Sequence, residues 1–289
     1  MTTLRVLVAT DGSAPARAAL ATVVDVPWPE GTRARAVVAR QASADRRSTL
    51  LSTLDRSADA EAASARHVLA RRWPDVEARV VDKAPVEGIL AEADRFQSDV
   101  IVLGWRGHGA VRRLLMGSVS RGVVRGAKCA VLVVRRRPRR VRRIAIGFDG
   151  SPHALRAVTL VGQLVPPPDG RVTLVGVVEL MATPSRAPTV AGIRSTIARE
   201  IRRLNTARSK QAMKALNAAA RELNRSGWRT RIELRTGEPL RELVATMNAA
   251  QHQLLVVGAR GTSGIRHLLL GSVAEGVLNR SALPVLVTR

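Results

Sequence analysis

Short runs of β-branched and aliphatic residues recur along the chain and alternate with longer segments in which apolar residues return at helical spacing. Runs that are apolar at every position are typical of parallel strands buried on both faces. The longer segments have the period of amphipathic helices. Strands are expected at 4–9, 35–39, 78–81, 99–103, 130–134, 144–148, 172–178, 231–234, 254–257 and 284–287.

The predicted elements form the same series, βαβαβαβαβ, in each half of the chain. Long helices are expected at about 46–72 and 193–223, and others start near Pro85 and Pro239. This series predicts an α/β fold of two tandem Rossmann-like domains, each a five-stranded parallel sheet with helices on both faces. We expect the domains at 1–135 and 144–289, joined by a linker at 136–143. Because the linker is short, the terminal strands should lie close together as a pseudo-twofold pair.

One glycine-rich segment occurs twice. Residues 104–119, GWRGHGAVRRLLMGSV, and residues 258–273, GARGTSGIRHLLLGSV, share the spacing G-x2-G-x9-G-S. When 104–133 is aligned with 258–287 without a gap, fourteen of thirty positions are identical. The chain is therefore a tandem repeat, and its function is to be sought in the repeated unit.

In each copy the glycines lie between a predicted strand and a predicted helix. Free N–H groups at a helix N-terminus favour an anion, and glycine lets a phosphate approach the backbone closely. Ser118 and Ser272 add a hydroxyl donor. A single such turn would also serve for chain reversal or close packing. Three glycines and a serine kept in register in both copies favour a ligand site.

An aspartate follows the first predicted strand of each half, at Asp11 and Asp149, within the matching sequences DGS. The carboxyl end of a strand is where ligands bind in open α/β sheets. The same residues would also form an N-cap or an Asx turn before the next helix. The second half has about sixteen more residues between its aspartate and Pro239 than the first half has between its aspartate and Pro85. We expect the extra residues in a loop at 181–195, as a lid or a surface insertion.

The composition suits a folded protein, with 46% hydrophobic and 24% charged residues. The net charge of +24 and the pI near 11.9 suggest a polyanionic partner. However, only four of the 47 basic residues are lysine, and the chain has no tyrosine, which is typical of a GC-rich coding bias. Most residues of the linker at 136–143 are arginine. The linker is expected to be a solvated connection or an anion-binding patch.

Cys129 is the chain's single cysteine, which excludes an intrachain disulfide and favours a small core residue. No apolar stretch approaches the length of a membrane span, and a predicted strand begins at Leu4. We therefore expect a soluble protein in a reducing, cytoplasmic setting, without a membrane partner.

The aspartates, the strand series and the G-x2-G-x9-G-S spacing together resemble the universal stress protein family, in its ATP-binding branch. The resemblance covers nearly the whole chain. It implies a fold of the adenine nucleotide alpha hydrolase-like type and one ATP site per repeat, with or without Mg²⁺, in a regulatory protein of stress or dormancy responses. In that family the aspartate holds the adenosine, the end of strand two borders the adenine, and the glycine loop cradles the phosphates.

Carried over by position, the resemblance implies nucleotide-binding residues in both halves. Arg106 and Arg260 are at matching loop positions, where a cation would meet phosphate charge or lie in solvent. Replacing Gly104 and Gly258 by alanine is expected to abolish nucleotide binding and leave the fold intact. The implied residues are Asp11, Gly12, Val38, Gly104, Arg106, Gly107, Gly117, Ser118 and Val119 in the first half, and Asp149, Gly150, Val177, Gly258, Arg260, Gly261, Gly271, Ser272 and Val273 in the second.

The first half departs from the family pattern at two places. Its second strand is polar, with arginines at 33 and 35, and Lys83 stands where the second half has Gly237. We therefore expect two sites of unequal affinity, with the adenine side of the first site the less secure.

No Walker A sequence and no His-Glu-x-x-His pair occurs, and His108 in the first glycine loop has Thr262 as its counterpart. The chain is expected to bind ATP and an unidentified protein partner, as an internal pseudo-dimer or a homodimer, and not to act as an enzyme. Two alternatives stay open: a slow ATPase that uses Asp11 or Asp149 with Mg²⁺, and a nucleic-acid or polyanion-binding protein that uses its arginine-rich surface.

Overall fold

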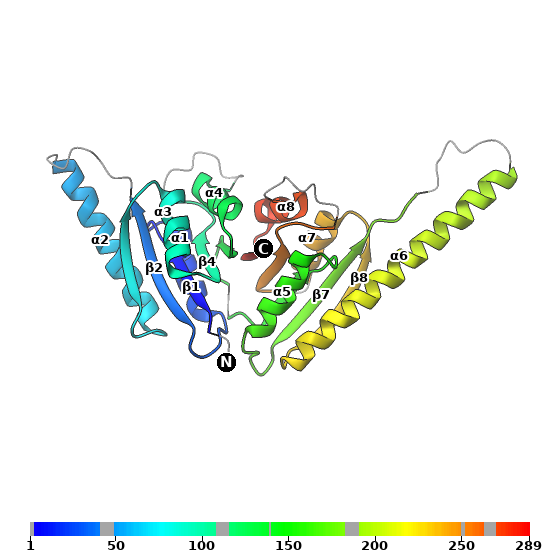
Figure 1. The fold of residues 1–289 in the computed structure, drawn as a ribbon, viewed down its shortest axis with the longest axis horizontal. Helices are drawn as coiled ribbons and strands as arrows, with labels where there is room; N and C mark the ends of the chain where they lie inside the picture. Colours follow the sequence, from blue (N-terminus) through cyan, green and yellow to red (C-terminus); the bar gives the residue numbers. More distant parts are fainter. Residues whose placement is uncertain are drawn as a thin grey trace.

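The computed structural model describes residues 3–40, 49–107, 116–138, 140–182, 191–249, 252–262 and 270–289, without the side chains of 49–55, 191–194 and 248–249. His108 and much of both glycine-rich segments therefore lie outside the described residues. Each half alternates strands and helices in the predicted order, and the α/β fold is confirmed (Figure 1). The first half comprises β1 (Arg5–Ala9), α1 (Ala14–Asp25), β2 (Arg33–Arg40), α2 (Thr49–Ala70), β3 (Glu77–Asp82), α3 (Pro85–Phe96), β4 (Val100–Gly104), α4 (Ser118–Gly126) and β5 (Ala130–Val134).

The second half repeats this series. Arg143, which was expected in the linker, is the first residue of β6, and the division of the chain into domains stays a prediction. The second half comprises β6 (Arg143–Gly147), α5 (Pro152–Gln163), β7 (Arg171–Val178), α6 (Ala191–Arg225), β8 (Arg229–Thr236), α7 (Pro239–Ala249), β9 (Leu254–Gly258), α8 (Ser272–Arg280) and β10 (Val285–Thr288).

All ten strands form one continuous sheet in the order β3-β2-β1-β4-β5-β10-β9-β6-β7-β8. Neighbours are parallel within each half, and the halves meet where β5 pairs antiparallel with β10, Val133 opposite Val285 and Val131 opposite Val287. The predicted closeness of the terminal strands is thus realised as hydrogen-bonded pairing. The sequence predicted two separate five-stranded sheets, and the structure has them joined as the two halves of one ten-stranded sheet.

The helices cover both faces of this sheet, as a parallel sheet buried on both sides requires. One core lies beneath α1, α2, α5 and α6, and the other beneath α3, α4, α7 and α8. Cys129 packs against the second core, and burial raises the pKa of its thiol to about 11. The thiol therefore stays protonated, as expected of a core residue. Among the described residues, no helix is both long and apolar enough to cross a membrane.

The extra residues of the second half lie mainly in α6, which has 35 residues where α2 has 22. The expectation of a loop at 181–195 is wrong at its end, because residues 191–195 already belong to the helix. Residues 183–190 lie outside the described part of the chain. Alanine, arginine and lysine make up 17 of the 35 residues of α6, and these residues have high helix propensity, which explains a helix where an insertion loop was expected.

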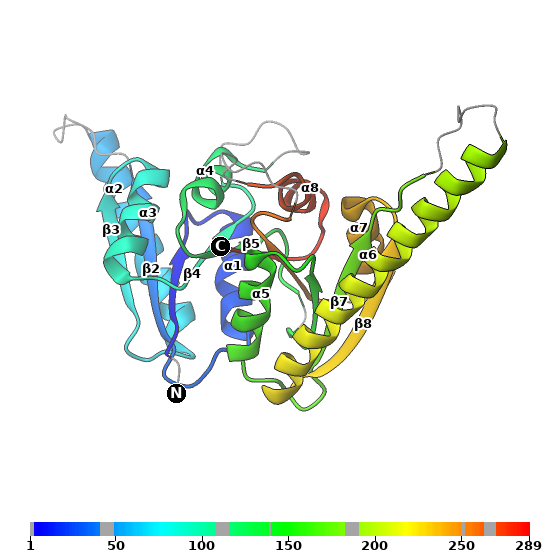
Figure 2. The ribbon, with the colours of Figure 1, turned by 45° about the vertical axis from the view of Figure 1, so that its right-hand side comes forward.

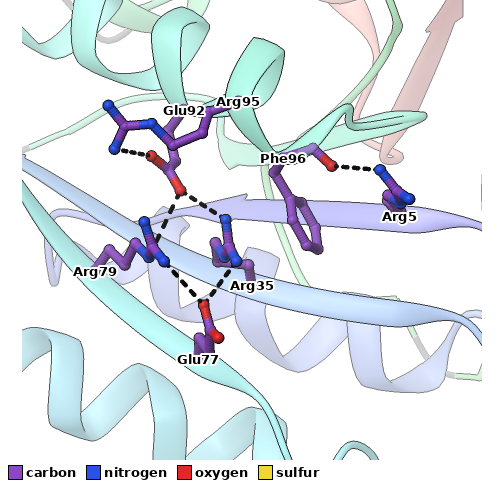
Figure 3. Close-up of polar contacts among 7 residues, drawn as sticks. All are labelled: Arg5, Arg35, Glu77, Arg79, Glu92, Arg95 and Phe96. Carbon is purple, nitrogen blue, oxygen red and sulfur yellow. Dashed lines mark hydrogen bonds and ion pairs between the residues drawn. The ribbon is translucent and has the colours of Figure 1, made fainter.

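The polar second strand of the first half is explained by an ion-pair network (Figure 3). Arg35 of β2 donates to Glu92 of α3 at 3.0 Å and to Glu77 of β3 at 2.7 Å, and it stacks on Phe96 at 4.3 Å. The Glu92 side chain is only 1% exposed and also lies 3.4 Å from Arg95. Arg35, a polar residue of β2, therefore forms an ion pair with the buried Glu92. This pair lies near the amino end of β2, away from the carboxyl edge of the sheet where ligands bind.

The equivalent register position in the second half is Thr173, whose hydroxyl lies 3.1 Å from Nε2 of His252. Both side chains are buried. Desolvation lowers the pKa of His252, which favours the neutral imidazole that a hydroxyl partner suits. The two halves thus fill the same place in the fold with different chemistry.

We predict that Glu92→Ala lowers the free energy of unfolding by about 3–5 kcal/mol, because it removes the buried carboxylate that pairs with the half-buried Arg35 guanidinium. Urea denaturation measures the change. The matched control is Glu77→Ala, whose carboxylate is 57% exposed and should contribute less than about 1 kcal/mol. Equal losses in the two variants would contradict the network as drawn.

We also predict that acid destabilises the second half through His252. Its folded pKa is lowered, so its contribution to stability is complete above the unfolded pKa of about 6.5 and is lost as the pH falls through the folded value. His252→Gln should flatten this part of the curve of stability against pH. The exposed His67, replaced in the same way, should leave the curve unchanged, and an identical effect of both substitutions would refute the assignment.

Candidate functional site

The candidate sites lie where the strand order of each half reverses. In the order 3-2-1-4-5 the switch falls between β1 and β4, and in the second half it falls between β6 and β9. Chains leaving two neighbouring parallel strands there turn to opposite faces of the sheet, which opens a crevice at the carboxyl edge. The two loops at each crevice are those that carry the aspartate and the glycine-rich segment.

Asp11 is held by its own loop rather than acting as the helix cap. Its Oδ1 accepts a hydrogen bond from the Ser13 amide at 3.0 Å. Ser13 is the N-cap of α1, because its Oγ accepts from the Ala16 amide at 3.3 Å. The Ser13 hydroxyl also donates to the carbonyl of Arg106 at 3.2 Å, which ties the aspartate loop to the glycine loop.

The second half repeats this arrangement atom for atom. Asp149 Oδ1 accepts from the Ser151 amide at 2.9 Å, and the Ser151 hydroxyl donates to the Arg260 carbonyl at 3.2 Å. Asp149 Oδ2 also accepts from the amide of Thr262 at 2.9 Å. Each aspartate is therefore fixed at the junction of the two loops, so the Asx turn and the crevice position expected from the sequence both hold.

Two glycines per site are required by geometry. A Cβ on Gly107 would lie 2.1 Å from Asp11 Oδ2, and one on Gly261 would lie 2.6 Å from Asp149 Oδ2. Gly12 and Gly150 have φ of +74° and +78°, in the left-handed region that favours glycine. The glycine after each aspartate and the second glycine of each GxxG turn thus allow the two loops to meet.

Gly104 and Gly258 serve packing. A Cβ on Gly104 would lie 2.7 Å from the amide nitrogen of Ala16, and one on Gly258 would lie 3.0 Å from that of Ala154. These glycines let β4 and β9 approach the first turns of α1 and α5. The added methyl groups of a Gly104→Ala/Gly258→Ala pair would therefore collide with backbone, and the expectation that this pair loses nucleotide and keeps its fold stays a prediction.

The helices α4 and α8 begin at the crevices. Gly117 and Gly271 are their N-caps and provide no side-chain acceptor for the first turn. Ser118 and Ser272 are exposed, while Val119 and Val273 are half-buried against the core. Each crevice therefore has the N-terminus of a nine-residue helix, with backbone N–H groups and a hydroxyl facing outward, as an anion site requires.

A cavity of about 110 Å³ lies at the first site. Asp11, Gly104, Arg106, Gly107 and Val119 line it, together with apolar side chains that the sequence did not single out. These additional lining residues include Ala39, Ile89 and Leu103.

Val38 lies outside this cavity. Its side chain packs against Ala58 and Ala62 of α2, on the other face of the sheet, because neighbouring residues of a strand point to opposite faces. The strand registers make Ala39 the equivalent of Val177, and both pack on the face that carries α3 and α7. The choice of Val38 was therefore one residue too early, whereas Val177 lies on the matching face.

Arginines surround both glycine loops. The guanidinium groups of Arg106 and Arg135 stack on the Trp105 ring at 4.3 and 3.9 Å. Burial, and then the charge of Arg106, lower the pKa of Arg135. Burial, and then the charge of Arg260, likewise lower the pKa of Arg289. Like charges held close together contribute a positive potential, which favours an anion.

Sequence reasoning missed two features of the first site. The Thr10 hydroxyl donates to Glu61 at 2.6 Å, which brings a carboxylate from α2 beside Gly12. Trp105 donates its indole N–H to the carbonyl of Leu278 in the second half at 3.0 Å. The counterparts of Thr10 and Trp105 are Phe148 and Ala259, so the repeat gave no signal for either residue.

We predict that Gly104→Ala destabilises the fold by about 1–3 kcal/mol, the usual cost of overpacking, whether or not nucleotide is present. Thermal unfolding monitored by circular dichroism measures it. The control is Gly162→Ala in α5, where an added Cβ would meet only the Ser226 side chain at 3.2–3.9 Å and helix propensity improves. A Gly104→Ala variant as stable as the parent would show that β4 and α1 can separate freely.

Comparison with known proteins identifies the repeated unit. A model of the universal stress protein family matches residues 3–135 and again 140–289. A universal stress protein of Mycobacterium tuberculosis is 31% identical over 211 residues, which are 69% of this chain and 61% of that protein. A second from the same organism is 29% identical over 232 residues, 76% of this chain and 71% of that protein. The first match thus spans about three fifths of the relative's length.

The fold is shared with solved structures. A universal stress protein from Archaeoglobus fulgidus superposes with a TM-score of 0.65 at 18% identity, over 99% of this chain and 96% of that one. This likeness extends over both halves, and the family model matches each half separately. The chain belongs to the universal stress protein family, with two copies of the family's domain in tandem.

Proposed function

We propose that each half of the chain binds one ATP molecule and that nucleotide occupancy regulates contacts with a protein partner in a stress response, with little or no ATP hydrolysis. One observation carries this proposal. In both halves an aspartate, a glycine turn and a helix N-terminus meet at the point where the strand order reverses, with matching hydrogen bonds. Binding sites of open α/β sheets form at that point.

The parts of the nucleotide would find complementary surroundings there. The phosphates would meet the first N–H groups of α4 and α8, the hydroxyls of Ser118 and Ser272, and the positive potential of the nearby arginines. The base would enter the apolar cavity between Ile89 and Leu103 in the first half. That cavity is smaller than a typical ligand pocket of about 300–1,000 Å³, so the phosphates would lie outside it along the helix N-terminus.

The aspartates are poorly placed to activate water. Both carboxylate oxygens of Asp149 already accept backbone N–H groups, and Asp11 Oδ2 lies against Gly107. These contacts occupy carboxylate lone pairs that a general base would need free to accept a proton from water. These contacts favour a role for the aspartates in positioning the nucleotide, which supports binding without turnover. Mg²⁺ would be held chiefly through the phosphates.

The two sites differ in the first turn of their helices. At the fourth helical position α4 has Arg121, whereas α8 has Glu275, an acid within its first turn. A carboxylate at that end opposes an incoming phosphate, although Glu275 is partly neutralised by Arg125 at 3.1 Å. We therefore propose unequal affinities, with the phosphates favouring the first site.

We predict that Asp11→Ala and Asp149→Ala each remove one of two Mg-ATP sites, since each loses the carboxylate that orders the loop beside the glycine turn. Isothermal titration calorimetry counts the sites, and the double variant should show none. Asp75→Ala, which removes an exposed carboxylate elsewhere, is the control and should keep both. Circular dichroism verifies that the variants fold.

Two-site binding that survives in the folded double variant would contradict the proposed site. Competition by ADP, AMP and a cyclic nucleotide in the same titration identifies the preferred ligand. Conversion of bound ATP to ADP at more than about one turnover per hour would replace the regulatory proposal with the slow ATPase.

A further inference from the structure

Helix α6 extends beyond the sheet that it covers. Its last turns are buried, with Leu216, Ala219 and Leu223 in the core, whereas none of the described side chains before Leu216 is fully buried. Figures 1 and 2 both show the amino-terminal half of α6 projecting past the ends of β7 and β8. Asn205 fixes this part of the helix by exchanging hydrogen bonds of 3.0 and 3.1 Å with the backbone of Met181.

The solvent side of α6 carries a regular row of positive charge. Pairs of cations four residues apart recur every eleven residues, which is close to three helical turns and returns each pair to the same face. All six side chains are exposed, and the row runs roughly 39 Å along the helix. We call this row the cationic stripe; it consists of Arg199, Arg203, Lys210, Lys214, Arg221 and Arg225.

This pattern opposes local helix stability. Like charges four residues apart cost an isolated helix about 0.2–0.5 kcal/mol per pair, and the stripe contains three such pairs. Among the described residues, the acid that lies within ion-pair distance of the stripe is Glu200, at 3.9 Å from Arg203. Residues that break a local rule without compensation in the fold are expected where function requires them.

Compositional bias does not explain the stripe. The pseudo-symmetric helix α2 carries two arginines and three acidic residues, although the same bias acts on it. Helix α6 has nine cations and two acids. Two of the chain's four lysines, Lys210 and Lys214, also belong to the stripe, where a preference for arginine codons alone would predict arginine.

The arginine-rich linker is a weaker anion surface than the sequence suggested. Arg137 pairs with Asp25 at 2.8 Å and Arg142 pairs with Asp169 at 2.6 Å. Arg135 is stacked on Trp105. These arginines therefore have structural roles, and α6 presents the less compensated charge.

We propose that the cationic stripe binds the phosphate backbone of a single-stranded nucleic acid. A straight row of about 39 Å matches a flexible linear polyanion, which can follow it from end to end. The backbone of a duplex winds around its axis and would leave a straight helix after part of that length. Helix α6 has no aromatic residue on which bases could stack, so binding depends on phosphates and is independent of base sequence.

A lipid surface fits the stripe less well. Helices that lie on membranes place cations beside an apolar face that enters the headgroup region. On α6 the apolar residues Leu216 and Leu223 face the sheet, on the side of the helix away from the stripe. The stripe cannot meet a membrane together with this buried face, and the large apolar side chains that α6 exposes among its described residues are Leu204 and Met213.

The test is fluorescence anisotropy of a labelled oligothymidine of about 20 nucleotides with the full chain over a range of salt concentrations. Six phosphate contacts on a single strand predict a slope of log K against log salt near −4. The variant Arg203→Gln/Lys210→Gln/Lys214→Gln should bind with a slope near −2 and, at low salt, at least about tenfold more weakly. Its Mg-ATP binding should be unchanged, which separates this proposal from the nucleotide sites.

The matched control is Arg66→Gln/Arg71→Gln/Arg241→Gln, which removes the same charge from exposed positions elsewhere and should keep the parent slope. Equal weakening in both triple variants would overturn the proposal, because binding would then depend on net charge alone. A parent slope shallower than about −1 would also overturn it. So would tighter binding to a duplex of the same length, or stripe-dependent sedimentation with anionic phospholipid vesicles in preference to the oligonucleotide.

Discussion

The antiparallel pairing of β5 with β10 is the contact on which the rest of this molecule depends. It joins two parallel five-stranded halves into one sheet. Leu132 and Leu286 are in register and buried in the core on one face, and Val133 and Val285 are in register and buried on the other. Because β4 neighbours β5 and β9 neighbours β10, the pairing also brings both candidate sites to the centre of the molecule. Figure 1 shows α4 and α8, the helices that begin at these sites, near each other there.

Each site therefore rests on contacts from the other half. Trp105, within the first GxxG turn, donates to the carbonyl of Leu278 in α8. Arg135 donates to the carbonyl of Ser281 at the end of α8, and Arg289 donates to that of Arg125 at the end of α4. A cation at a helix C-terminus is favoured by the helix dipole, so these reciprocal contacts stabilise the interface. They also link α4 and α8 each to the residue that follows the last strand of the opposite half.

The sequence predicted the strand series and the glycine turns well, because buried parallel strands and repeated glycines leave strong local patterns. It misplaced features that depend on three-dimensional register. Val38 differs from Ala39 only in which face of β2 it occupies, and that is decided by pairing with β1 and β3. Gly104 has a packing role because α1 approaches β4, a contact between segments far apart in the chain. The buried Glu92 and its arginines likewise gave no local signal.

We propose above all that the repeated crevice binds one ATP in each half. It is tested most directly by denaturing the freshly purified protein and counting the released nucleotide per chain by ion-exchange chromatography. Two sites predict close to two nucleotides per chain, mainly ATP, or close to one if the weaker site empties during purification. Release of no nucleotide, followed by no uptake when Mg-ATP is added to the folded protein, would contradict it.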